Sequence, residues 1–401
     1  MIELPAEDGT VTRYRPNREP RSFTRDSTPF RSRSVLAAAP VVGDPLAPNE
    51  PFGPPLGPPP AQALDWDATL AVRRELWSHG FTVAEGLDTA HRGAGLDWPT
   101  TAELIRRTGA AAAETGGRFA AGVWTDQLDP FSPHTRDAVV AAYEEQLDVV
   151  NEAGAQPIIQ AGTPLAAAVQ SPEEYAEVYA GLLRRSAKPA VLHWLLPEWV
   201  PGHAGYWGHQ DPQAATEAFL AVVADNADRI DGVKVAPLSP EAEVALRRRL
   251  PAGVRFYTGD YDTYTDLIAG DEQGHSDALS PVFTPIAPLA AEALRTLDTG
   301  DTDSFRKQLG QAHELSAHLF QGPGRSTLFF KTGLVFLSWL SGHIGHFRMV
   351  WAEHGARSVP HLAQAYRLAD ELGLFPDPEL AAHRIARFLD LSGFPQEGIG
   401  R

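Results

Sequence analysis

The sequence predicts an α/β protein: a (β/α)8 TIM barrel with an N-terminal β-ribbon and proline-rich loop and a C-terminal helical layer. Between residues 34 and 300, short apolar runs rich in β-branched residues alternate with amphipathic helical segments. Continuous apolar runs of this length are typical of parallel strands buried on both faces. Counted from Val35, the alternation gives eight strand–helix units, the number that closes a parallel barrel.

The eight predicted strands are short and mostly bounded by Gly, Pro, Asn or Asp. They cover residues 34–42, 80–86, 118–124, 156–160, 189–195, 230–236, 254–258 and a last short strand near His275. The predicted helices that follow them cover residues 65–79, 100–115, 135–153, 172–185, 211–227, 240–249, 264–269 and 285–297. A doubly wound open sheet is the alternative, but no Gly-rich phosphate loop follows the first strand.

The segments that flank the barrel predict three parts: an extension over residues 1–33, the barrel over 34–300 and a helical layer over 301–401. A hairpin is expected around Asp8 and Gly9. Nine prolines in residues 40–60 predict a rigid extended loop over one mouth of the barrel, or else a linker between domains. The apolar C-terminal helices are a candidate interface for a homo-oligomer.

Composition and charge narrow the class of function. A net charge of −17 argues against nucleic-acid and anionic-membrane partners. The chain has no cysteine, which excludes disulfides and thiolate metal sites and is typical of a cytoplasmic protein. The first residues are too polar for a signal peptide, and Lys331 interrupts the most apolar stretch before it reaches the length of a membrane span. We therefore expect a small-molecule partner.

Lys234 is the residue on which the functional prediction depends. It is one of only four lysines, with Lys188, Lys307 and Lys331, and it lies within the predicted buried strand 230–236. Burial disfavours the charged form of an amine and so leaves it nucleophilic. A neutral buried amine is the group that forms an imine with a carbonyl compound.

In barrels of this type the site lies at the carboxyl ends of the strands. The predicted catalytic residues are Lys234 and, as a proton relay, His193. The predicted substrate-binding residues are Glu85, Asp88, Thr89, Gln160, Tyr257, Asp260 and His275. We predict no metal and no cofactor.

Three motifs in this order resemble the Schiff-base lyases typified by dihydrodipicolinate synthase and N-acetylneuraminate lyase, in a poorly characterised dihydrodipicolinate-synthase-like branch. The motifs are residues 231–234 (DGVK), 257–261 (YTGDY) and the stretch from 268–270 (IAG) to 274–276 (GHS). The resemblance implies a TIM barrel with added helices, an imine on Lys234, and aldolase, lyase or dehydratase activity on a keto acid or keto sugar.

Two departures from the family pattern alter the expected substrate. The family's Leu-Tyr-Asn-x-Pro, which supplies a proton-relay tyrosine, is replaced by LHWLLP at residues 192–197. The family's Gly-Thr-Thr-Gly-Glu, which binds the keto-acid carboxylate, is replaced by EGLDTAHRG at residues 85–93. Carboxylates at this position would repel the carboxylate of pyruvate, although Arg92 or the Thr89 hydroxyl could partly restore the site. We therefore expect a polar carbonyl compound that is not necessarily pyruvate.

Other interpretations of the same residues remain open. His193 is also compatible with a buried structural histidine, Asp260 with a helix cap, and Tyr257 with core packing. Glu85, Asp88, His193 and His275 could instead form the metal site of a sugar isomerase or epimerase. The barrel could also bind a small molecule without catalysis.

Overall fold

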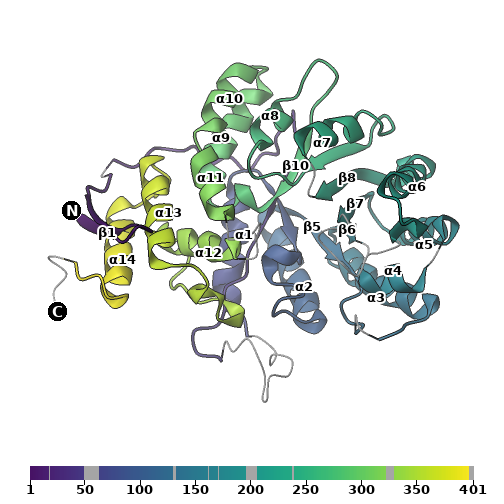
Figure 1. Ribbon diagram of the computed structural model, residues 1–401, viewed down its shortest axis with the longest axis horizontal. Coiled ribbons are helices and arrows are strands. Elements are labelled where there is room, and N and C mark those ends of the chain that lie inside the picture. Colours follow the sequence, from purple (N-terminus) through teal and green to yellow (C-terminus); the bar gives the residue numbers. More distant parts are fainter. Residues whose placement is uncertain are drawn as a thin grey trace.

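The chain folds into a closed barrel of eight parallel strands surrounded by helices (Figure 1). This computed structural model describes the whole chain except residues 18, 49–62, 130–131, 161, 170, 196–205, 237–238, 322–328 and 397–401. The barrel strands are β3 (Val35–Ala38), β4 (Thr82–Glu85), β5 (Arg118–Val123), β6 (Gln156–Gln160), β7 (Ala190–Leu195), β8 (Ile230–Ala236), β9 (Arg255–Thr258) and β10 (Asp277–Ser280). β10 pairs with β3 and closes the barrel, which confirms the predicted fold class.

The helices between the strands form the outer ring of the barrel. They are α1 (Trp66–Ser78), α2 (Trp98–Thr115), α3 (Arg136–Glu152), α5 (Pro172–Arg185), α6 (Pro212–Asp225), α7 (Pro240–Arg247), α8 (Tyr264–Ala269) and α9 (Ala287–Asp298), with a short extra helix α4 (Thr163–Ala168) after β6. Local sequence fixes where many of them begin. In α5, for example, Ser171 and Glu174 form a capping box and Pro172 occupies the first turn.

Side chains alternate between the two faces of each strand, and this alternation sets which residues face the site. On β8, Val233 and Val235 lie in the large core between strands and helices, so Lys234 points to the barrel interior. The interior core includes Ala84, Ala120 and Ile158 together with Tyr257.

The C-terminal layer consists of α10 (Thr302–Gly310), α11 (His313–Phe320), α12 (Phe330–Leu340), a 3-10 turn η7 (Val350–Gly355), α13 (Val359–Glu371) and α14 (Pro378–Leu391). The apolar helix α12 is buried by its neighbours in the same chain. Its apolarity therefore does not by itself require a partner subunit, and the predicted homo-oligomer and the domain boundaries stay predictions.

The N-terminal hairpin packs on this C-terminal layer (Figure 1). β1 (Ile2–Pro5) and β2 (Val11–Tyr14) pair in antiparallel register around the predicted turn. The Tyr14 hydroxyl donates to Asp370 on α13 at 2.7 Å. Residues far apart in the sequence thus form one unit beside the barrel. Most of the predicted proline-rich loop lies outside the described residues. None of the described helices is long and apolar enough to cross a membrane.

Candidate active site

Four predicted site residues form one row across four neighbouring strands. Gln160 on β6 pairs in register with His193 on β7, His193 with Lys234 on β8, and Lys234 with Tyr257 on β9. Neighbouring strands lie about 4.8 Å apart, so their inward side chains are within reach of one another. The row brings the predicted nucleophile and the predicted proton relay together.

Lys234 is in the environment that an imine-forming lysine needs. The residue is only 8% exposed. Burial lowers the pKa of the Lys234 ammonium, while the negative charge of Asp88 opposes the shift. Among the described residues, no side chain or carbonyl forms a hydrogen bond or ion pair with its amine. The amine is therefore easier to deprotonate than an ordinary surface lysine.

His193 lies beside this amine with its ring nitrogens open. It is 7% exposed, and neither ring nitrogen has a hydrogen-bond partner within the part of the chain that the structure describes. Burial, followed by the charge of Lys234, lowers the pKa of His193 well below its ordinary value. The imidazole is therefore neutral at neutral pH and has a nitrogen open to accept a substrate proton, but its lowered pKa makes it a weaker base than the relay prediction assumed, and the relay stays a prediction.

Tyr257 reaches in the opposite direction from the other residues of the row. Its hydroxyl donates to the Asp231 carboxylate and lies 3.2 Å from the Ser34 hydroxyl, both at the amino ends of strands. Burial, followed by the charge of Asp231, raises the pKa of Tyr257. The Tyr257 ring is part of the barrel core, as the alternative prediction of core packing for this residue states.

The loop after β4 supplies polar groups near the row. Asp88 and Thr89 lie on a 3-10 turn, η1 (Asp88–Ala90). Asp88 is exposed, and its charge acts on both Lys234 and His91. Thr89 is buried, and its hydroxyl has no partner among the described residues. The side-chain carbonyl of Gln160 is likewise unpartnered within the described chain. These buried unpaired groups are candidates for hydrogen bonds to a substrate.

Glu85 does not lie with these residues. It is fully buried on the outer side of β4, where Arg73 of α1 binds both of its carboxylate oxygens at 2.9 Å. Thr108 of α2 also donates to it at 2.8 Å, and so does the Gly86 amide at 2.9 Å. Its oxygens are thus occupied in joining the strand to two helices. Glu85, which we predicted to bind the substrate, therefore holds the strand to the helices instead.

Asp260 and His275 also lie apart from the row. One Asp260 oxygen accepts the amides of Asp262 and Thr263 in the turn ahead of α8, whose N-cap is Thr263, so Asp260 shapes the turn and does not cap the helix. His275 precedes the last strand, which begins only at Asp277. The chain is still turning at His275, because Asp271 and Gly274 form a tight bridge immediately before it. The predicted strand near His275 is thus displaced, and the residue lies at the amino end of the barrel.

This placement separates the four residues of the alternative metal site. Glu85 is bound to Arg73 outside the barrel, and His275 is at the barrel end opposite to His193. In the described portion of the chain, no group of three or more metal-ligating side chains is close enough to hold an ion. The residues proposed for an isomerase centre are therefore not assembled.

Arg92, which could have bound a substrate carboxylate, is already occupied. Its buried guanidinium donates to both oxygens of Asp126 at 2.9 and 2.6 Å. It also donates to the carbonyls of Gly86 and Gly122 at 3.1 and 2.7 Å. The side chain therefore joins the loop after β4 to β5, and it leaves Thr89 as the group available on this loop.

Sequence reasoning missed a buried cluster beside Asp88. His91 Nε2 lies 2.6 Å from a carboxylate oxygen of Glu353, and the same oxygen is 3.9 Å from the amine of Lys331. His91 has a φ of 60°, and two non-glycine residues with φ of 58° and 54°, Trp351 and Ala352, precede Glu353. Such strain collects at functional sites. His91 and Glu353 lie far apart in the sequence, so no local sequence pattern indicates their contact.

The fold and the position of the lysine define an eight-stranded (β/α) barrel with a buried amine in its sixth strand. Solved structures of the dihydrodipicolinate synthase family have this fold. One is an E. coli K12 prophage protein of the dihydrodipicolinic acid synthase family in complex with pyruvate, at 13% identity and a TM-score of 0.60, covering 85% of this chain and 99% of that one. Another is dihydrodipicolinate synthase from Thermotoga maritima, at 14% identity and a TM-score of 0.58, covering 86% and 100%.

The chain belongs to the family described as "Protein of unknown function (DUF993)", whose model matches residues 2–394. A comparison with curated proteins gave no match. The likeness to dihydrodipicolinate synthases noted from three motifs is thus confirmed for the fold, while the chemistry at Lys234 stays a prediction.

Proposed function

We propose that the protein is an imine-forming lyase of the class I aldolase type that acts on a polar, hydroxyl-bearing carbonyl compound. The observation that carries the proposal is the row in which the buried Lys234 amine lies beside the unpaired imidazole of His193. The dihydrodipicolinate synthase fold supports it, since the motif around Lys234 puts this lysine on the sixth strand of that fold.

The reaction begins when the neutral Lys234 amine attacks the carbonyl carbon of the substrate. The resulting carbinolamine loses water and leaves an iminium ion on the lysine. The bond between the carbon next to the iminium carbon and the hydroxyl-bearing carbon beyond it then breaks. Its electron pair flows into the iminium to give an enamine. His193 takes the proton of the hydroxyl group on the departing carbon. Protonation of the enamine carbon and hydrolysis of the iminium release the second product and restore the amine.

The groups around the row favour a hydroxylated substrate. The Gln160 side-chain carbonyl and the Thr89 hydroxyl, both unpartnered among the described residues, can accept hydrogen bonds from substrate hydroxyls. Asp88 disfavours a carboxylate next to the lysine, and Arg92 is held by Asp126. A keto sugar or a sugar-derived keto acid with its carboxylate remote from the carbonyl fits these groups better than pyruvate does.

Turnover of a substrate panel tests the proposal. Keto sugars, sugar-derived keto acids and pyruvate are incubated with the wild-type protein, with Lys234→Arg and with Lys307→Arg, an exposed lysine on α10. We expect cleavage of a hydroxylated compound by the wild-type and Lys307→Arg proteins and none by Lys234→Arg. A preference for pyruvate would refute the substrate class, and full activity of Lys234→Arg would refute the mechanism.

A further inference from the structure

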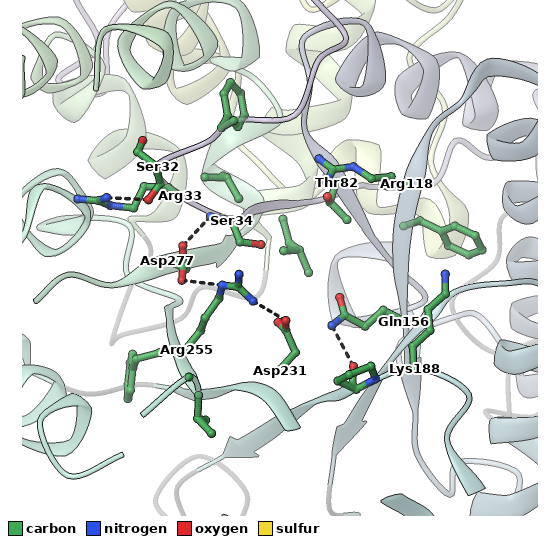
Figure 2. Close-up of a pocket in the computed structure, with 18 of the residues that line it drawn as sticks. Ser32, Arg33, Ser34, Thr82, Arg118, Gln156, Lys188, Asp231, Arg255 and Asp277 are labelled. Carbon is green, nitrogen blue, oxygen red and sulfur yellow. Dashed lines mark hydrogen bonds and ion pairs between the residues drawn. The ribbon is translucent and has the colours of Figure 1, made fainter. Parts of the chain in front are cut away.

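A cavity lies at the amino end of the barrel, opposite to the candidate active site (Figure 2). Its volume is about 1260 Å³. All eight strands border it through residues at or just before their amino ends: Ser34, Thr82, Arg118, Gln156, Pro189, Asp231, Arg255 and Asp277. The amino end of such a barrel usually contributes stability only, and a cavity of ligand size there is unusual.

The cavity is lined mainly by positive charge, although the protein has a net charge of −17. Seven basic residues line it: Arg31, Arg33, Arg118, Lys188, Arg247, Arg248 and Arg255. Among the residues that the structure describes, its only lining carboxylates are Asp231 and Asp277. Arg255 binds both, at 2.5 Å to Asp231 and 3.4 Å to Asp277, as Figure 2 shows. Both lining carboxylates are therefore already engaged by one arginine.

Four of the lining cations have no carboxylate partner in the described chain: Arg31, Arg33, Arg118 and Lys188. The Arg33 guanidinium donates to the carbonyls of Ser32 and Ile268 at 2.7 Å and of Ala269 at 3.2 Å. Lys188 donates to the Gly154 carbonyl, and Arg118 has only a long contact of 3.5 Å to the Gly80 carbonyl. Backbone carbonyls satisfy these donors without neutralising the positive charge, and only Arg33 among the four also feels nearby carboxylates, those of Asp277 and Asp298, within the described chain.

The surroundings of these cations respond to the excess charge. Burial lowers the pKa of both Arg33 and Arg118. It also lowers the pKa of His275 to about 4, and the charges of Arg33, Arg247 and Arg255 contribute. The cavity wall therefore holds excess positive charge on exposed and half-buried side chains, which an anion would stabilise, since a nearby opposite charge favours the ionised form.

We infer that this cavity binds a small polyanion that carries two or more phosphate or carboxylate groups. The guanidinium groups of Arg31, Arg33 and Arg118 match the oxygens of either group, and Lys188 adds a point charge, on the side of the cavity away from Arg33 in Figure 2. A site at the amino end leaves the carboxyl end free for catalysis. The inference is independent of the proposed reaction.

Isothermal titration calorimetry at constant ionic strength tests this site. Inorganic pyrophosphate, inorganic phosphate and citrate are the probes, and glycerol is the neutral control. We expect pyrophosphate or citrate to bind more tightly than phosphate, because two anionic groups contact more of the cations. Tighter pyrophosphate binding would indicate a phosphorylated ligand, and tighter citrate binding a polycarboxylate. No binding of either at millimolar concentration would overturn the inference.

Variants that each remove one positive charge, inside or outside the cavity, locate the site. Arg118→Gln and Lys188→Gln remove exposed side chains that contact only carbonyls, so the fold should persist. Each should weaken binding about tenfold, the loss expected for one charged contact. Arg106→Gln, an exposed arginine on α2 outside the cavity, should leave the affinity within about twofold of wild type. Equal weakening by Arg106→Gln, or loss of binding in Lys234→Met, would place the anion elsewhere.

Discussion

The buried ion pair between Arg73 and Glu85 gives a stability prediction that separates a structural carboxylate from a substrate-binding one. Both side chains are 0% exposed, and two hydrogen bonds of 2.9 Å join them. Arg73→Met leaves the Glu85 carboxylate buried with only Thr108 and the Gly86 amide as donors. Breaking one side of such a pair costs about 3–5 kcal/mol, because the remaining charge is uncompensated.

This loss is measured by urea unfolding monitored by circular dichroism, as a shift in the urea concentration at the unfolding midpoint. The double variant Arg73→Met/Glu85→Leu removes both charges, and we expect it to recover most of the stability. Exposed Arg107→Met, which loses a surface pair with Glu103 and a cation–π contact with Trp66, is the control and should change stability by about 1 kcal/mol at most. A loss below about 1 kcal/mol in Arg73→Met, or a double variant as unstable as the single one, would refute the structural role.

Three further predictions test the site and its surroundings. Burial raises the pKa of Glu243 to about 7 from 4.5, so the folded protein holds a proton there that the unfolded chain releases; stability should fall as pH rises from 4.5 to 7, by about 3 kcal/mol at most, and Glu243→Gln should flatten this dependence in unfolding midpoints. His193→Asn should lower kcat about 10²–10⁴-fold in steady-state assays while the imine still forms, and an unchanged kcat would remove His193 from the relay. Exhaustive chelation should leave turnover unchanged, whereas loss of activity and its recovery with one divalent ion would favour the metal-dependent isomerase.

Sequence periodicity predicted the barrel because most of its strands have a strong local signal. The run at residues 230–236 coincides with β8, and 156–160 coincides with β6. The last strand was displaced because Gly270 and Gly274 extend the turn before it, and a four-residue strand gives little periodicity. For the helical layer predicted over residues 301–401, the break between α10 and α11 was not predicted.

The site was only partly predictable, because the sequence gives the end of a strand but not the face on which a side chain lies. The side chains of Lys234, His193 and Gln160 all point into the barrel. The three residues pair in register across the neighbouring strands β8, β7 and β6. Glu85 lies one residue after the inward Ala84 and so points to Arg73 instead. Tyr257 faces inward, but the length of its ring takes the hydroxyl to Asp231. The partner of His91 comes from η7, far along the chain.

Covalent trapping on Lys234 tests the central claim most directly. The protein is incubated with the best substrate of the panel and reduced with borohydride, and its peptides are analysed by mass spectrometry. A reduced imine on the peptide that contains Lys234, absent without substrate and absent in Lys234→Arg, is the result we predict. An adduct on Lys331, the lysine near Glu353, or an unmodified Lys234 during active turnover, would contradict the account.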